Sequence, residues 1–122
     1  MKSLNRAFSL IELMIAVAIL VVAILSLLAT FINCVFLNES NNNLVSAVSD
    51  AQYVLEQIKG LAYSDIATYA APVFTNLTGE AITLTRSTLA RPKGELTEVT
   101  VKVSWTERQR SRDVSLSTRF AQ

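Results

Sequence analysis

The hydrophobic residues of this chain are concentrated in its first third, where they form one nearly continuous run. Between Leu13 and Ile32 the only polar side chains are those of Ser26 and Thr30. About twenty helical residues with a rise of about 1.5 Å each span roughly 30 Å, the thickness of the hydrocarbon core of a bilayer. The pattern therefore predicts a membrane-spanning helix near the N-terminus.

A second apolar pattern follows at helical spacing and predicts an amphipathic continuation over residues 33–62. Its expected apolar face consists of Leu44, Val45, Val48, Ala51, Val54, Leu55, Ile58 and Ala62. The asparagine-rich residues 38–43 weaken helix propensity, so one long helix and two separate helices are both possible. The early return of the apolar pattern favours one long helix. Gly60 marks its expected end, and Ser64 and Asp65 the start of a further short helical turn.

The last part of the chain alternates apolar and polar residues with a period of two, which is typical of half-buried strands. The alternation is clearest at residues 97–106, followed by residues 113–120 and, more weakly, residues 81–89. Turns are expected at residues 91–94 and 107–112. The predicted fold class is α+β: a long N-terminal hydrophobic helix extending into a small head with a three-stranded antiparallel sheet.

Composition limits the chemistry that the chain offers. Its 122 residues suit one small domain plus a membrane segment, and its net charge of +1 gives no general attraction to nucleic acid. The sequence has no histidine, which excludes His-based metal sites and His-dependent nucleophiles. The single cysteine, Cys34, cannot form a disulfide within the chain. We therefore assign no catalytic, cofactor-binding or metal-binding residue and do not expect an enzyme.

Two groups of side chains have both a functional and a structural interpretation. Arg108, Arg110 and Arg112 fall in the expected last turn and form either a nucleic-acid patch or a solvated hairpin turn. A few arginines without stacking aromatics are a weak nucleic-acid footprint, which favours the solvated turn. The second group consists of three tyrosines, Tyr53, Tyr63 and Tyr69. They form either an aromatic pathway for electron transfer or packing contacts at the border of helix and head, and packing is favoured.

One acid interrupts the N-terminal apolar pattern. Glu12 lies between Ile11 and Leu13, where a carboxylate costs a few kcal/mol in a bilayer and therefore suggests a function. A basic peptide with Lys2 and Arg6 precedes it, and the positive-inside rule then places the N-terminus in the cytoplasm. An ordinary secretory signal and a plain signal anchor are alternatives. The small-residue cleavage pattern that a secretory signal requires occurs only in the middle of the apolar run. A plain signal anchor does not explain the presence of Glu12.

The order of basic leader, small residue, Phe and an acid five residues into the apolar run resembles the class III signal of type IV prepilins and type II secretion pseudopilins. This resemblance covers residues 6–32. It implies that prepilin peptidase cleaves between Ala7 and Phe8 and then N-methylates Phe8. Glu12 matches the acid at the fifth mature position of the family. Ala7 departs from the glycine that the family usually has before the cleavage site.

The resemblance implies a structural subunit without a cofactor. Its implied function is that of a minor pilin-like protein assembled into a type IV pilus, or priming or modifying one. A type II secretion pseudopilin and a membrane-anchored DNA-uptake protein are the alternatives. The strand ending in Val103-Ser104-Trp105 is similar to that of type IV pilus V-class minor pilins. The implied partners are prepilin peptidase, other pilin subunits, the inner-membrane assembly platform and membrane lipid, whereas nucleic acid is disfavoured.

The expected organisation is a leader peptide (1–7), a transmembrane or filament-core helix (8–32), an amphipathic continuation (33–62) and an α+β head (63–122). The implied location is the bacterial inner membrane, with a cytoplasmic N-terminus and a periplasmic head, and afterwards a pilus or pseudopilus filament. In staggered chains, the carboxylate of Glu12 meets the new N-terminal amine of a neighbour. Because a buried charge is tolerated only when paired, this contact would set the register of assembly.

Overall fold

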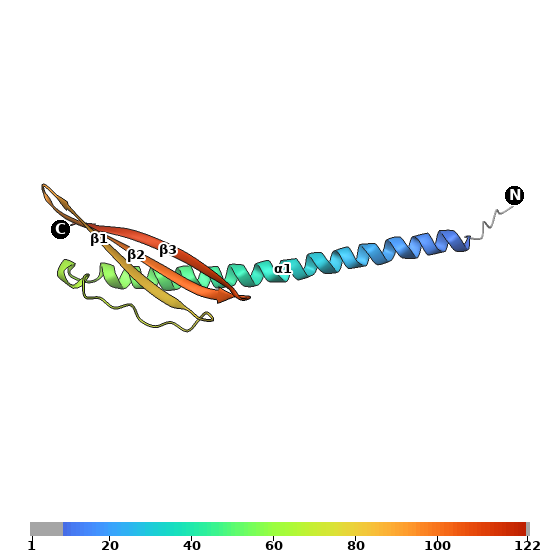
Figure 1. Ribbon diagram of the computed structural model, residues 1–122, viewed down its shortest axis with the longest axis horizontal. Coiled ribbons are helices and arrows are strands. Elements are labelled where there is room, and N and C mark those ends of the chain that lie inside the picture. The colour runs from blue at the N-terminus through green and yellow to red at the C-terminus, as the bar shows by residue number, and fades with distance from the viewer. Residues whose placement is uncertain (1–8, 122) are drawn as a thin grey trace. The chain divides into compact units, whose positions relative to one another are not determined.

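The computed structural model describes residues 9–121. They form two compact units, one ending at Glu39 and the other beginning at Ser40, and each is described by itself. The elements in chain order are helix α1 (Leu10–Lys59), the 3-10 turn η1 (Tyr63–Asp65) and strands β1 (Ala81–Arg91), β2 (Gly94–Glu107) and β3 (Arg110–Ala121) (Figure 1). The predicted α+β class, with one long N-terminal helix and a three-stranded antiparallel sheet, is confirmed.

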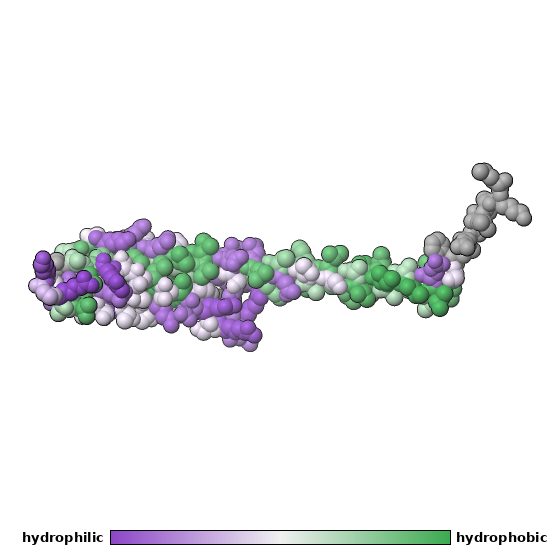
Figure 2. All heavy atoms as spheres, turned by 90° about the horizontal axis from the view of Figure 1, so that it is seen from above, coloured by the Kyte–Doolittle hydropathy of each residue, from purple (hydrophilic) through white to green (hydrophobic). Residues whose placement is uncertain are grey.

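The first unit is the N-terminal part of α1. Its large apolar side chains are exposed in every direction, from Leu10 and Ile11 to Phe36 and Leu37. Figure 2 shows this part of the helix as a mostly hydrophobic surface. A helix that is apolar on all sides is suited to lipid or to a bundle of other helices, and not to water.

Helix α1 passes through the asparagine-rich residues 38–43 without a break, which confirms the single long helix. The loss of propensity at each asparagine is a few tenths of a kcal/mol, and packing of the following turns against the sheet outweighs it. The helix ends where Gly60 predicts. The Gly60 N–H donates to the Glu56 carbonyl oxygen at 3.2 Å, and the Leu61 N–H donates to that of Ile58 at 3.1 Å.

The sheet belongs to the second unit and has the order β1-β2-β3, with both pairs antiparallel. Two-residue turns join the strands, Pro92–Lys93 in the first hairpin and Arg108–Gln109 in the second. Gly94, with φ of 132°, has a backbone conformation that residues with side chains rarely adopt. The central strand β2 has the predicted alternation, and the buried side chains of that face are Thr97, Val99, Val101, Val103, Trp105 and Glu107.

The hydrophobic core lies between β2 and the C-terminal part of α1. One continuous cluster of buried residues comprises Ala47, Ala51, Val54, Leu55, Ile58, Ile66, Leu77, Val99, Val101, Val103 and Trp105. The side chains that flank it from β1 and β3 include Ile82, Leu84, Val114 and Leu116. Small residues on the helix allow the sheet to approach closely, so the branched side chains of β2 are fully enclosed.

Two details differ from the sequence-based expectation. The buried helix face is rotated toward Ala47 and Asp50, while Leu44 and Val45 are 44% and 67% exposed. The helix packs with its small residues against the bulky face of β2, so the largest apolar residues do not define the contact. The second turn is also shorter than residues 107–112, because β2 includes Glu107 and β3 begins at Arg110.

Truncating Ile58 tests this core. Ile58 is fully buried, so Ile58→Ala should lower the free energy of unfolding of the second unit by roughly 2–5 kcal/mol. The chain's single tryptophan, Trp105, is 4% exposed, and its fluorescence reports the transition during denaturation of the detergent-solubilised chain. The control Val45→Ala, at an exposed position of the same helix, should change stability by less than about 0.5 kcal/mol. Equal losses in the two variants would contradict the described packing.

Candidate functional site

The helix begins with a capped N-terminus. The Glu12 N–H donates to the Ser9 carbonyl oxygen at 3.0 Å and lies 3.3 Å from Ser9 Oγ, and the Leu13 N–H donates to the same carbonyl oxygen at 3.2 Å. Ser9 is therefore the N-cap residue, and Glu12 follows at the spacing of a capping box. Sequence reasoning missed this role of Ser9, although the Ser-x-x-Glu spacing is visible in the chain.

Glu12 is exposed in the first turn of α1. The unpaired N–H groups of a helix N-terminus favour negative charge, which offsets part of the cost of a carboxylate beside an apolar helix. The role of Glu12 in assembly stays a prediction. The predicted cleavage and methylation positions Ala7 and Phe8, and the leader charges Lys2 and Arg6, lie outside the described residues.

Within residues 9–121, α1 is the one helix that is long and apolar enough to cross a membrane. The two hydroxyl groups of its apolar segment, residues 13–32, are satisfied inside the helix. Ser26 Oγ donates to the Val22 carbonyl oxygen at 2.8 Å, and Thr30 Oγ1 donates to the Ser26 carbonyl oxygen at 2.9 Å. Because hydrocarbon offers no hydrogen-bond partners, these internal bonds allow both residues to face lipid.

Two carboxyl groups meet in the second unit, where sequence reasoning recognised no such pair. Asp50 on α1 is 7% exposed and accepts hydrogen bonds from Asn76 Nδ2 at 3.2 and 3.0 Å. Glu80, just before β1, accepts a bond from the Leu77 N–H at 3.1 Å and lies within hydrogen-bond reach of Asp50. The signal missed in the sequence was the position of Asp50 on the face shared by Ala47, Ala51 and Val54.

The surroundings of Glu80 raise the pKa of its carboxyl. Burial raises the pKa of the Glu80 carboxyl, the Leu77 N–H lowers it, and the hydrogen bond and repulsion from Asp50 raise it again. Glu80 Oε1 is buried without a hydrogen-bond partner among the described residues. Protonated Glu80 has a proton to donate to Asp50, which satisfies both groups. The cluster fastens the segment before β1 to the helix.

The three arginines of the predicted turn lie partly in a turn and partly in a strand. Arg108 lies in the hairpin turn, whereas Arg110 and Arg112 lie in β3. Arg112 Nε lies 3.7 Å from Glu107 Oε2, and Ser40 Oγ donates to the same oxygen at 3.2 Å. Arg112 is thus linked through Glu107 to Ser40 on α1.

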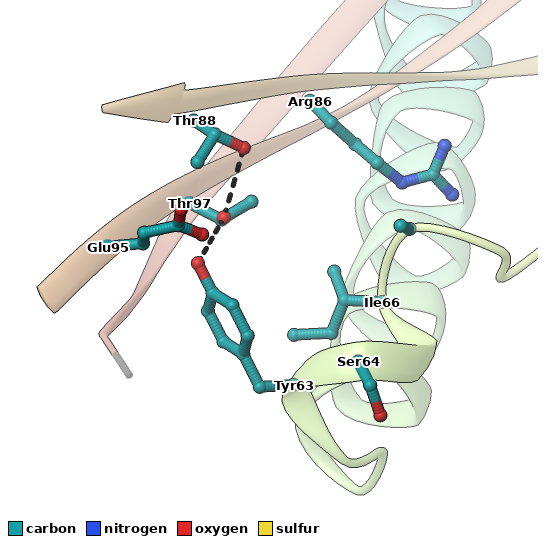
Figure 3. Close-up of a pocket in the computed structure, with 8 residues that line it drawn as sticks. Tyr63, Ser64, Ile66, Arg86, Thr88, Glu95 and Thr97 are labelled. Atoms are coloured by element: carbon teal, nitrogen blue, oxygen red, sulfur yellow. Dashed lines mark hydrogen bonds between the residues drawn. The ribbon is translucent and has the colours of Figure 1, made fainter. Parts of the chain in front are cut away.

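A pocket of about 290 Å³ lies between η1 and the strands β1 and β2 (Figure 3). The Tyr63 hydroxyl is 2.7 Å from Thr97 Oγ1, which is 3.2 Å from Thr88 Oγ1. The Arg86 guanidinium donates to the Tyr69 carbonyl oxygen and so is occupied in holding the segment after η1. The pocket combines hydroxyl groups with the tethered Arg86 cation and the carboxylate of Glu95.

The remaining candidate residues have structural positions. The rings of Tyr53 and Phe74 meet edge to face at 5.9 Å, and Tyr63 and Tyr69 pack against the core, which agrees with a packing role. Cys34 is an exposed free thiol on α1. Within residues 9–121, no cluster of three His, Cys, Asp or Glu side chains is arranged to hold a metal ion.

Comparison with known proteins agrees with the N-terminal features. Residues 2–32 match the family model described as the prokaryotic N-terminal methylation motif. Neither the curated proteins nor the solved structures contain a match to the chain. The matched range includes the capped helix start, Glu12 and the apolar segment.

The carboxyl pair predicts an unusual pH dependence. Because the pKa of Glu80 is raised in the folded state, its contribution to stability is complete below the ordinary pKa of 4.5 and is lost as pH rises through the raised value. Glu80→Gln supplies a permanent donor to Asp50, so the variant should be more stable than the parent at pH 8, with the difference shrinking toward pH 4. Urea unfolding followed by Trp105 fluorescence at several pH values measures it.

The control for this experiment is Glu95→Gln, which removes an exposed carboxylate elsewhere on the sheet. Its stability difference from the parent should stay near zero across the same pH range. A Glu80→Gln variant that is less stable than the parent at pH 8 would contradict a hydrogen bond from protonated Glu80 to Asp50.

Proposed function

Because the N-terminal segment is a type IV pilin-like class III signal, we propose that this chain is a minor pilin-like structural subunit of a type IV pilus. The signal implies processing by prepilin peptidase and assembly with other pilins. The observation that carries the proposal is the methylation motif on residues 2–32, continuous with a single apolar helix and followed by a small sheet. In this proposal the subunit enters the filament, or primes or modifies it.

The exposed apolar surface of α1 suits both the membrane-inserted state and the filament-assembled state of such a subunit. In the membrane it contacts lipid, with the N-terminus in the cytoplasm and the head on the other side. In the filament the same side chains pack against the helices of neighbouring subunits, where tight contact replaces lipid. The internal hydrogen bonds of Ser26 and Thr30 serve in both surroundings, because neither hydroxyl needs an external partner.

Glu12 is the residue that distinguishes assembly from simple anchoring in this proposal. The capped helix start holds its carboxylate in the first turn, next to Ser9. Cleavage between Ala7 and Phe8 creates a cationic amine only four residues before it. Pairing between Glu12 and the amine of a neighbouring subunit neutralises both charges inside the bundle and fixes the axial offset of adjacent helices.

A type II secretion pseudopilin is the close alternative, because it uses the same signal. Two features favour the minor pilin. The head is small and has no disulfide, and the V-class-like strand segment Val103-Ser104-Trp105 supplies two core side chains, Val103 and Trp105. The two functions differ in the filament into which the subunit is assembled. Co-purification of the subunit with a type IV pilus or with a secretion pseudopilus distinguishes them directly.

Processing is tested by the intact mass of the membrane-extracted chain, with and without co-expressed prepilin peptidase. With the peptidase, the mass should correspond to loss of residues 1–7 and gain of one methyl group on Phe8. Without it, the full-length mass should remain. An uncut chain beside a peptidase that is active on a control substrate would contradict processing and would favour a permanently anchored protein.

The role of Glu12 is tested by Glu12→Ala, which should abolish recovery of the subunit in sheared filaments while leaving its expression and membrane insertion unchanged. The physical reason is the loss of the charge that pairs with the neighbour's amine. Immunoblots of the sheared and membrane fractions measure the effect. The control Ser26→Ala removes a hydroxyl that is bonded only within its own helix, so this variant should assemble normally. Normal incorporation of Glu12→Ala would exclude the register role.

A further inference from the structure

The face of the sheet that meets the core changes from apolar to polar toward one end. Arg86 and Thr88 follow the apolar inward residues of β1, and Glu95 and Thr97 precede those of β2. The register pairs Thr88 with Thr97, so all four positions belong to the same end of the sheet. Because core-facing positions are normally apolar, this end is suited to polar contacts and not to core packing.

The turn η1 and the residues directly after it face this end of the sheet. Together with the strands they enclose the pocket of about 290 Å³ described above (Figure 3). Ile66 gives the pocket one apolar wall, and Tyr63 reaches across to Thr97 on β2. Ligand sites in proteins generally have volumes of roughly 300–1,000 Å³. The pocket lies at the lower end of that range and suits a compound with a single ring.

Three hydroxyl groups form a hydrogen-bonded chain along the pocket. The Tyr63 hydroxyl lies 2.7 Å from Thr97 Oγ1, which lies 3.2 Å from Thr88 Oγ1, and either partner can donate in each bond. Since each hydroxyl has one proton, two bonds leave one proton free at one end of the chain. The opposite end then accepts. This chain can therefore offer either a donor or an acceptor, which suits a ligand whose own polar groups are hydroxyls.

Two charged side chains complete the polar lining. The Arg86 guanidinium donates to the Tyr69 carbonyl oxygen, but its Nε is buried without a hydrogen-bond partner among the described residues. A buried donor without a partner costs stability, and a ligand oxygen would supply the missing acceptor. Glu95 is exposed at the other side of the pocket, and its carboxylate accepts hydrogen bonds from several donors.

The separation of these charges argues against a free amino acid as the ligand. Arg86 pairs with Val99, and Glu95 lies four residues from Val99 on β2, so their Cα atoms are about 13 Å apart along the strands. The Arg86 side chain also extends away from Glu95 (Figure 3). The ammonium and carboxylate of an α-amino acid are on neighbouring carbons and do not span such a gap. One cation and one anion cancel, which favours a neutral ligand with polar groups around its edge.

We propose that this pocket binds one neutral sugar ring. Glu95 accepts hydrogen bonds from ring hydroxyls, the end of the hydroxyl chain at Thr88 exchanges a hydrogen bond with another, and Arg86 donates to a ring oxygen. The C–H face of the ring packs against Ile66. The site belongs to the head alone, so it goes beyond the proposed function and does not depend on assembly into a filament.

The test is ligand-observed saturation-transfer NMR on the full chain in a zwitterionic detergent without a sugar headgroup, because a glycosidic detergent would compete for the site. The probes are D-glucose, D-galactose, D-mannose and N-acetyl-D-glucosamine, with L-serine as the zwitterionic comparison. At least one sugar should bind saturably. Its Kd should be about 1–10 mM, because a ligand of about twelve non-hydrogen atoms makes few contacts.

Two variants remove polar groups from the pocket with little change in shape. Glu95→Gln and Thr88→Val should each raise the Kd of that sugar at least about fivefold, because each leaves a ligand hydroxyl without its partner. The matched controls are Glu56→Gln, at an exposed position of α1, and Thr85→Val, on the opposite face of β1 from Thr88. Both controls should keep the parent Kd.

Folding of each variant is scored by the fluorescence of the buried Trp105. Glu95→Gln changes an exposed side chain and is expected to fold, so it decides the outcome even if Thr88→Val does not fold. The proposal is overturned if none of the four sugars binds saturably, or if Glu95→Gln binds sugar as the parent does. Equal losses in Glu95→Gln and Glu56→Gln also overturn it. Saturable binding of L-serine without binding of any sugar would assign the pocket to a zwitterion instead.

Discussion

The structure of the head depends on the contact between the small-residue face of α1 and the inner face of β2. Ala47 and Ala51 allow the sheet to approach the helix, and Val99, Val101 and Val103 fill the space between them completely. A small head without a disulfide has few other sources of stability, since burial of apolar surface must balance the entropy of ordering the chain. The same helix leaves its N-terminal part uncovered, so one element serves a protein core at one end and an apolar environment at the other.

Polar groups position the segments that this core does not hold. The Asp50, Asn76 and Glu80 cluster fastens the segment before β1, and the Arg86 guanidinium fastens the segment after η1 through the Tyr69 carbonyl oxygen. Buried polar groups stabilise only when they are paired, so each tether also restricts the positions that its segment can adopt. The loop between helix and sheet is therefore ordered by a few specific bonds and not by regular secondary structure.

Much of the architecture was predictable because it follows from periodicity. The apolar run, the return of a helical pattern after the asparagines and the alternation along β2 fixed the order and type of the elements. The rotation of the helix face was not predictable from apolar residues alone, because the contact selects small side chains and accepts Asp50. That choice depends on Asn76 and Glu80, which lie far along the chain and approach only in the folded head. The Ser9 cap was visible as a local motif, whereas the approach of the Asp50 and Glu80 carboxyl groups requires tertiary structure.

The two outer strands of the sheet each pair on one side only among the described residues. Exposed strand edges are templates for pairing with other chains, and charged side chains along them oppose such pairing. β3 carries Arg110, Arg112, Asp113 and Arg119, and β1 carries Arg86 and Arg91. Charges on both edges therefore discourage heads from joining edge to edge into a continuous sheet, which protects the protein from aggregation.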